Sequence, residues 1–177
     1  DISAQAHVRA MQYCQPGIHE FEIEAELIHQ FMRSGLRAVA YPSIVAAGKN
    51  ACVLHYTENA DKLRKGDLLL IDAGAECDHY AADITRTFPV SGKFTEPQRL
   101  LYQLVLDAQE AALAEIAPGK AWNKAHEASV EVLTKGLVEL GLLKGRVKKL
   151  IKEETNTLLT ETTLTNLEAG ESYVCRA

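Results

Sequence analysis

The chain contains 177 residues, which is the size of one domain, or of one domain and a fragment, at about 150 residues per domain. Apolar residues make up 47% and charged residues 24%, a composition typical of globular proteins that excludes disordered and fibrous classes. With 19 basic and 24 acidic residues the net charge is −5. Because the chain is mildly acidic and has no long basic run, we expect no nucleic-acid partner.

We expect no association with membranes either. No stretch of the sequence approaches the roughly 18 apolar residues that a spanning helix needs, and the first residues lack the pattern of a signal peptide. Because the chain begins with Asp1 rather than Met, we expect it to be part of a longer protein. Its scattered cysteines, without a C-x-x-C pair, favour reduced thiols and a cytoplasmic location: Cys14, Cys52, Cys77 and Cys175.

Two amphipathic helices are predicted at the start of the chain, over residues 2–14 and 19–34. Apolar residues at helical spacing define the expected inner face of the first helix: Ile2, Ala6, Ala10, Met11 and Cys14. The expected inner face of the second is defined in the same way: Phe21, Ala25, Ile28 and Met32. Pro16-Gly17 separates the two helices, and Gly35 is suited to end the second.

Strands are predicted in the middle of the chain. Short apolar segments interrupted by turn-forming residues read as strands and loops; the interruptions are Pro42, Gly48 and Asn50. From Gly66 the sequence predicts a strand over 68–72, a turn, and a second strand over 80–90.

Helices return after the strands. A helix over 95–116 begins with a capping box in which Thr95 is the N-cap residue and Gln98 the N3 residue. A further helix covers 122–140. This order of helices, strands, an antiparallel hairpin and helices indicates the α+β class rather than a regular alternation of strand and helix.

The segment 66–90 carries two aspartates, Asp72 and Asp83, at a spacing that a hairpin brings together. If the hairpin turns at Cys77-Asp78, the aspartates are directly opposed on one face, with Cβ atoms about 4.5–5.5 Å apart. Two such carboxylates repel each other unless a divalent cation lies between them, and hard cations such as Mg²⁺ or Mn²⁺ prefer carboxylate oxygens. Two alternatives stay open: the turn falls elsewhere, or one aspartate pairs with Arg86.

Four strings accompany these aspartates: His55–Asn59 (HYTEN), Ile71–Gly74 (IDAG), Ala82–Val90 (ADITRTFPV) and Gly92–Thr95 (GKFT). With them, residues 4–145 resemble the bacterial aminopeptidase P (Xaa-Pro aminopeptidase) family, which is related to prolidase and methionine aminopeptidase. The resemblance implies the pita-bread fold. The antiparallel hairpin with the two aspartates and its flanking helices would form part of that fold.

The resemblance also implies a metal-dependent aminopeptidase, which removes the N-terminal residue from peptides with proline in the second position. The family holds two Mn²⁺ ions with two aspartates, one histidine and two glutamates. Asp72 and Asp83 match the two aspartates, and His55 matches a histidine near the substrate that binds it or moves protons. A glutamate ligand acts as the general base for the water that attacks the scissile carbonyl.

The sequence departs from the family after residue 150. The H-G-x-x-H and V-E-P-G segments, which bring the histidine ligand and one glutamate, are absent. Residues 153–177 instead resemble the family's final strand and place Glu154 at the position of the second glutamate, as metal ligand and general base. We therefore expect an incomplete pita-bread domain, with residues 1–152 as its first part and 153–177 as a remnant of its end.

This departure leaves three readings of the function. The chain is an Xaa-Pro aminopeptidase, or it is a catalytically inactive, truncated relative that acts at most as an oligomeric or binding fragment. A peptide-binding module without metal is the third reading, which the two retained aspartates disfavour. We also expect the apolar strand at 68–71 to lack cover without the missing half, which favours a homo-oligomer.

Overall fold

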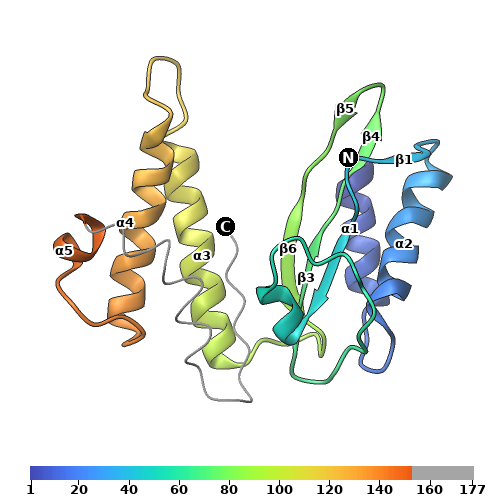
Figure 1. Cartoon of the computed structure of the whole chain (residues 1–177), viewed down its shortest axis with the longest axis horizontal. Coiled ribbons are helices and arrows are strands. Elements are labelled where there is room, and N and C mark those ends of the chain that lie inside the picture. The colour runs from blue at the N-terminus through green and yellow to red at the C-terminus, as the bar shows by residue number, and fades with distance from the viewer. Residues whose placement is uncertain (153–177) are drawn as a thin grey trace. The chain divides into compact units, whose positions relative to one another are not determined.

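The computed structural model in Figure 1 describes residues 1–152. The chain separates into two compact units, Asp1–Phe94 and a second one that begins at Thr95. Within the described residues, no helix is long and apolar enough to cross a membrane. The predicted division into 1–152 and 153–177 stays a prediction, because residues 153–177, Glu154 among them, lie outside the described part of the chain.

The first unit combines two helices with short strands, which confirms the predicted α+β class. Its helices are α1 (Ile2–Tyr13) and α2 (Glu20–Arg33). Its strands are β1 (Ala38–Val39), β2 (Ile44–Ala47), β3 (Leu68–Asp72), β4 (Ala75–Cys77), β5 (Tyr80–Ala81) and β6 (Thr85–Pro89), and a short 3-10 helix, η1 (Gly48–Cys52), follows β2.

These strands form two three-stranded antiparallel sheets that continue into each other at a bend. Their orders are β1-β4-β5 and β2-β3-β6, so the same three stretches of chain run through both sheets (Figure 1). Backbone hydrogen bonds carry the pairing across the bend. The Ala73 N–H donates to the Ile84 carbonyl at 3.1 Å, and the Ala82 N–H donates to the Ala75 carbonyl at 3.0 Å. The single strand predicted over 80–90 is thus divided into β5 and β6.

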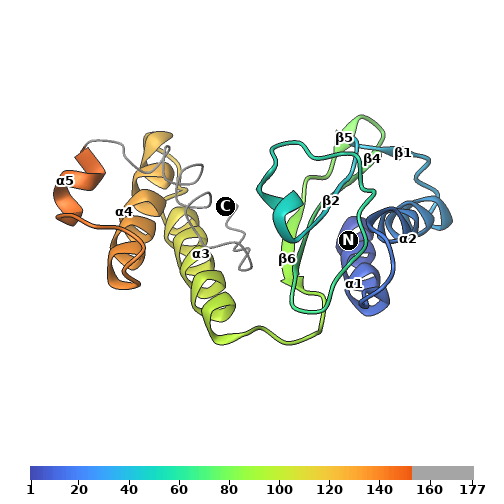
Figure 2. The same ribbon diagram turned by 60° about the horizontal axis from the view of Figure 1, so that its bottom comes forward.

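Helices α1 and α2 lie side by side against the sheet, as Figure 1 and Figure 2 show. The inner stripe of α1 consists of Ser3, Ala6, His7 and Ala10. Ala6 and Ala10 are therefore confirmed as inner-face residues, whereas Met11 is 39% exposed and its predicted inner position is wrong. Because the inner side chains are mostly small, α1 lies close enough for Ser3 and His7 to reach the sheet backbone.

The predicted inner face of α2 is wrong. The buried residues of the helix are Glu20, Ile23, Leu27 and Phe31, whereas Phe21 and Met32 are 51% and 54% exposed. The helix has two apolar stripes, and the buried one carries three large side chains while the other includes the small Ala25. The buried stripe also contains Glu20, whose carboxylate finds its hydrogen-bond donors on that side only.

The core of the first unit lies between the two helices and the sheet. Its apolar cluster joins α1 and α2 to Leu69 and Ile71 of β3. Strand alternation turns Leu68 and Leu70 to the opposite face, and both are buried as well, at 4% and 0% exposed. The expectation that this strand lacks cover is therefore wrong, and the strand gives no support to a homo-oligomer.

The described part of the second unit is helical: α3 (Glu96–Ala114), α4 (Asn123–Glu139) and α5 (Val147–Lys152). The predicted capping box is confirmed, because the Gln98 N–H donates to Thr95 Oγ1 and the Thr95 N–H donates to Gln98 Oε1. Helices α3 and α4 pack side by side (Figure 1). At their contact, a Cβ on Gly136 would lie 2.2 Å from Leu104 Cδ1, so this glycine permits the close packing.

Candidate metal site

The hairpin that carries the two aspartates turns one residue later than predicted. Cys77 pairs with Tyr80, so the turn residues are Asp78 and His79. Both have left-handed backbone conformations, with φ of 50° and 70°, as a two-residue hairpin turn requires. The predicted turn would have put Cys77 in that conformation, which aspartate adopts more readily.

The later turn moves the strand pairing by two residues. Asp72 lies opposite Thr85, so the prediction that Asp72 and Asp83 are directly opposed is wrong. Because side chains alternate with a period of two, a shift of two residues keeps both aspartates on the same face as diagonal neighbours. The alternative partner, Arg86, donates to the Thr85 carbonyl at 2.7 Å. In the described residues no ion pair joins it to either aspartate.

The hydroxyl of Tyr41 lies between the two carboxylates. It donates to Asp72 Oδ1 at 2.6 Å and, in a longer contact, to Asp83 Oδ1 at 3.1 Å. Burial, followed by the hydrogen bonds to the two carboxylates and their negative charge, raises the pKa of Tyr41. The hydroxyl therefore stays protonated and able to donate. Both carboxylates converge on one point, on the face of the sheet that is turned away from α1 and α2.

Sequence reasoning missed Tyr41. The residue lies 31 positions before Asp72, between β1 and β2, and only the pairing of these strands with β4 and β3 brings it to the aspartates. The one local signal is Pro42, which favours an extended conformation at the residue before it. That signal predicts the backbone at Tyr41 but not what its side chain faces.

Gly74 allows the chain segment of Asp83 to approach the end of β3. A Cβ on Gly74 would lie 1.7 Å from the Ala82 carbonyl oxygen and 3.2 Å from the Asp83 backbone nitrogen. Any other residue would push this segment away and move the Asp83 carboxylate with it. The glycine of the IDAG string thus has a steric role at the candidate site.

His55 lies in the loop after η1. It is exposed and has a left-handed backbone conformation, with φ of 53°. Among the described residues, no hydrogen bond or ion pair joins it to Asp72 or Asp83, so its predicted role stays a prediction. Another residue of the HYTEN string has a clear structural role, because the buried Asn59 side chain accepts from the Val45 N–H at 2.9 Å.

The carboxylate of Glu20 anchors this loop. It is fully buried at the N-terminus of α2, where the helix dipole favours negative charge. It accepts four hydrogen bonds: from the Ala47 N–H (2.7 Å), Asn50 Nδ2 (3.1 Å), Tyr56 Oη (2.8 Å) and the Asp61 N–H (2.9 Å). Burial and the bond to Glu20 raise the pKa of Tyr56 to about 12, so this phenol remains a donor. The loop that carries His55 is thereby held on both sides.

The residues present fit a divalent cation in part. Asp72 and Asp83 supply hard carboxylate oxygens, which Mg²⁺ and Mn²⁺ prefer, and these oxygens converge. Within residues 1–152, however, no three metal-binding side chains form a cluster, and Glu154 lies outside the described residues. The described part of the chain therefore holds two ligands of a candidate site.

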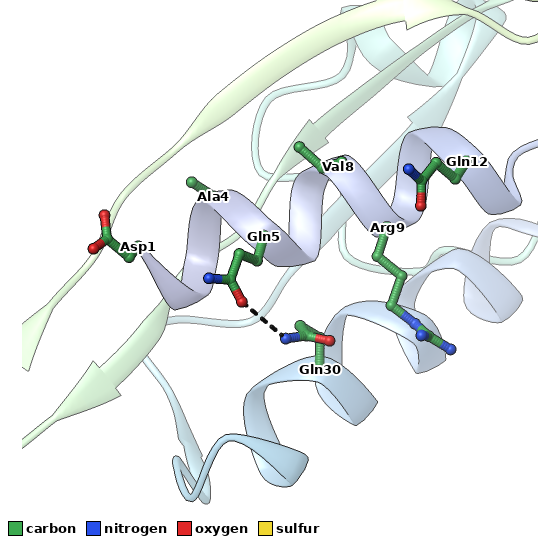
Figure 3. A pocket seen from close by; sticks show the side chains of 7 residues that line it. All are labelled: Asp1, Ala4, Gln5, Val8, Arg9, Gln12 and Gln30. Atoms are coloured by element: carbon green, nitrogen blue, oxygen red, sulfur yellow. Dashed lines mark hydrogen bonds between the residues drawn. The ribbon is translucent and has the colours of Figure 1, made fainter.

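A separate groove lies on the first unit. It is open, measures about 490 Å³ and runs along the outer side of α1 and α2 (Figure 3). Polar side chains line much of it, and Gln30 Nε2 donates to Gln5 Oε1 across it at 3.4 Å. His55, Asp72 and Asp83 do not line this groove, so it is distinct from the candidate metal site.

Two aspartates that converge on the outer face of a bent sheet, in an α+β unit, characterise the chain as a candidate metal-binding protein. Residues 1–165 match the model of metallopeptidase family M24, and the chain belongs to this family. Its fold is the pita-bread fold of the family, of which the described residues form a part.

The relatives of the chain are Xaa-Pro aminopeptidases. It is 51% identical over 153 residues to the Xaa-Pro aminopeptidase of Haemophilus influenzae, which covers 86% of this chain and 36% of that protein. It is 55% identical, with a TM-score of 0.87, to the structure of Pseudomonas aeruginosa aminopeptidase PepP, over 89% of this chain and 36% of that one.

Structures of Escherichia coli aminopeptidase P match with a TM-score of 0.85 and 48–49% identity, over 87% of this chain and 35% of that one. They include a zinc-substituted form in complex with product and alanine variants of single histidines and aspartates. The chain thus spans about a third of the length of the relatives that it matches.

Proposed function

We propose that this chain provides the two-aspartate part of a Mn²⁺ site in an Xaa-Pro aminopeptidase, which hydrolyses the bond between the first residue of a peptide and a proline. The observation that carries the proposal is the convergence of Asp72 and Asp83 on the Tyr41 hydroxyl. Two carboxylates held at one point are destabilising unless a cation or a donor neutralises them. The cation of a metallopeptidase site would neutralise the two carboxylates.

Each residue of the candidate site would have its own role. Asp72 and Asp83 would hold the metal, and Glu154 would join them as a ligand and general base. The bound metal would supply Lewis acidity toward the peptide carbonyl and a lowered pKa for water. Tyr41 would orient the Asp72 carboxylate by its hydrogen bond. His55, exposed on its anchored loop, would contact the substrate.

The relatives support this assignment by spacing. The alanine variants of E. coli aminopeptidase P include one at a histidine and two at aspartates. The separations of those three residues along that chain equal the separations of His55, Asp72 and Asp83 along this one. The zinc-substituted form with product shows that the E. coli protein takes a divalent metal, whereas Mn²⁺ as the metal of this chain is part of the proposal.

A second candidate is an inactive relative that binds metal weakly or not at all. The observation that favours it is the lack of a third metal-binding side chain near the two aspartates in residues 1–152. The two candidates differ in two measurable properties, the stoichiometry and the affinity of Mn²⁺ binding.

The decisive experiment is a calorimetric titration of the 177-residue chain with Mn²⁺ at neutral pH. We compare it with Asp72→Asn and Asp83→Asn, and with Asp78→Asn as a matched control at the exposed hairpin turn, where asparagine also tolerates the left-handed backbone. The proposal expects binding by the wild-type chain and the control, and its loss in the other two variants. Wild-type binding that survives both substitutions would overturn the site, and an absence of wild-type binding would favour the inactive relative.

Two further predictions concern the cellular location and the oligomeric state. We propose a cytoplasmic location, which the scattered cysteines without a C-x-x-C pair support. The predicted homo-oligomer stays a prediction, which light scattering of the purified chain tests. A monomer at micromolar concentration would contradict it.

A further inference from the structure

Two side chains of α1 bind the backbone of the sheet at its bend. His7 Nε2 lies 3.0 Å from the Ala73 carbonyl oxygen, and Ser3 Oγ accepts from the Ala75 N–H at 3.1 Å. Ser3 and His7 are one helical turn apart on the inner stripe of α1 and are 5% and 2% exposed. At the bend between β3 and β4, these two backbone groups thus form hydrogen bonds with side chains of α1 instead of with a neighbouring strand.

The chemistry of the His7 contact is defined by its partner. A carbonyl oxygen accepts and never donates, so His7 donates from Nε2 and is the tautomer with hydrogen on that nitrogen. Its Nδ1 is then an acceptor, and it is buried without a hydrogen-bond partner in the described part of the chain. A buried acceptor without a partner is unfavourable. An apolar residue would avoid this cost, so the imidazole is explained by the bond that it donates.

The position of that bond connects it to the candidate metal site. Ala73 follows Asp72 directly, and the Ala73 N–H donates to the carbonyl of Ile84, the residue after Asp83. The Ala73 carbonyl is bound to His7 on the helix side. Ala73 is thus linked to both chain segments that carry the carboxylates, and His7 binds it from the helix side of the sheet.

We infer that His7, assisted by Ser3, is a positioning residue for the pair Asp72 and Asp83, acting through the backbone of Ala73. This inference rests on the proposed metal site for its consequence and on the α1 contacts for its structural part. His7 touches no ligand oxygen. It fixes the backbone from which the two carboxylates project, as residues outside the ligand shell do at other metal sites.

The test compares three variants of the 177-residue chain. His7→Phe keeps a ring and removes the donor, and His7→Gln keeps a donor near the position of Nε2. Ala6→Gly weakens the same helix but keeps both contacts. For each we measure amide hydrogen exchange at Ala73 and Ala82, relative to the Leu70 amide inside β3, and the affinity for Mn²⁺ alone.

The inference expects His7→Phe to accelerate exchange at Ala73 and Ala82 relative to Leu70, and to weaken Mn²⁺ binding by about tenfold or more. His7→Gln should restore both in part. Ala6→Gly should change exchange at all three amides together and leave the Mn²⁺ affinity near that of the wild type. A purely structural role for His7 predicts that His7→Phe behaves like Ala6→Gly, and that result would overturn the inference.

Failure of the proposed function is separable from failure of this inference. If the wild-type chain binds no Mn²⁺, the metal site is wrong, whereas selective exchange at Ala73 and Ala82 in His7→Phe still supports the positioning of the bend. If His7→Phe does not fold, Ser3→Ala takes its place, because it removes only the acceptor for the Ala75 N–H. Unchanged exchange at Ala73 and Ala82 in Ser3→Ala, relative to Leu70, would then overturn the inference without any reference to metal.

Discussion

The two units of the chain differ in how completely they bury their apolar side chains. In Asp1–Phe94 the helices and the sheet share one buried cluster, and residues such as Ile23 and Leu69 are fully inaccessible. In the described part of the second unit, large apolar residues remain on the surface, with Leu113 at 59%, Ile116 at 69% and Trp122 at 98% exposed. The first unit has one contiguous buried apolar core, whereas within residues 95–152 these three large apolar side chains stay exposed.

This difference predicts where substitutions matter. Asp72, Asp83, Gly74, Glu20 and His7 belong to the first unit. The glycine, the glutamate and the histidine each have a counterpart of the same residue type in the described part of the second unit. Matched pairs of substitutions therefore measure the difference directly, because the same or a similar side chain is removed from different surroundings.

The largest difference is expected for apolar truncation. Phe31→Ala, at a side chain 1% exposed, should lower the free energy of unfolding by about 3–5 kcal/mol, since it removes buried area and leaves a cavity. Leu113→Ala, at 59% exposed, should change it by less than about 0.5 kcal/mol. Urea denaturation followed by circular dichroism measures both. Equal losses would show that the second unit has a core of its own at Leu113.

The two tightly packed glycines should give the next largest difference. Gly74→Ala places a Cβ against the Ala82 backbone carbonyl, which cannot move aside without opening the sheet. We expect a loss of about 3 kcal/mol and weaker Mn²⁺ binding, since the Asp83 segment is displaced. Gly136→Ala meets the end of the Leu104 side chain, which can rotate, and alanine also favours the helix.

We therefore expect the loss for Gly136→Ala to be smaller than about 1 kcal/mol. The same denaturation experiment compares the two variants, and calorimetry follows the metal. A Gly74→Ala chain with wild-type stability and Mn²⁺ affinity would show that the segment at Ala82 has room that the structure does not give it.

A third pair compares two glutamates. Glu20→Gln replaces one carboxylate oxygen by an amide that donates, so at least one of the four donors, three of which are buried, loses its acceptor. The expected loss is about 2 kcal/mol. Glu96 is exposed and pairs with Arg99 at 2.7 Å on the surface of α3. Glu96→Gln should cost less than about 0.5 kcal/mol.

Salt provides the control for this pair, because it screens the exposed ion pair of Glu96 and leaves the buried bonds of Glu20 nearly unchanged. The loss caused by Glu20→Gln should therefore be the same at low and high ionic strength. A strong dependence on salt would show that the Glu20 carboxylate is accessible to water.

Local signals predicted much of the first unit, and they failed where two parts of the chain compete or meet. Strand 68–72 and the capping box at Thr95 depend on adjacent residues and were predicted correctly. The inner face of α2 was predicted wrongly, because its two apolar stripes are similar in sequence. The hydrogen-bond donors around Glu20, which come from distant residues, distinguish them. The hairpin turn was displaced by one residue, because both candidate turns contain Asp78.

The candidate site shows the same limit. Asp72 and Asp83 were found because they share one hairpin, and the displaced turn left them on one face because the shift was even. Tyr41 and His7 were missed as parts of the site, since they reach it by contacts with distant strands. Such contacts follow from the packing of the whole unit and leave no local pattern in the sequence.

The smallest expected effect is a dependence of stability on pH that separates two histidines. Burial lowers the pKa of His7 below its usual 6.5, against the opposing effect of its bond to the Ala73 carbonyl. Between the lowered pKa and 6.5 the unfolded chain binds more protons than the folded one at this residue. The contribution of neutral His7 to stability is therefore complete above pH 6.5 and is lost as the pH falls through that window.

His7→Gln should remove this part of the pH dependence, so that the unfolding free energies of the wild type and the variant converge as the pH falls from 7 toward 5. His126→Gln makes the same substitution at an exposed position of α4 and provides the matched control for the change of side chain. Urea titrations across this range measure all three chains, and a His7→Gln profile parallel to the wild type would show that His7 is open to water and to protons in the folded chain.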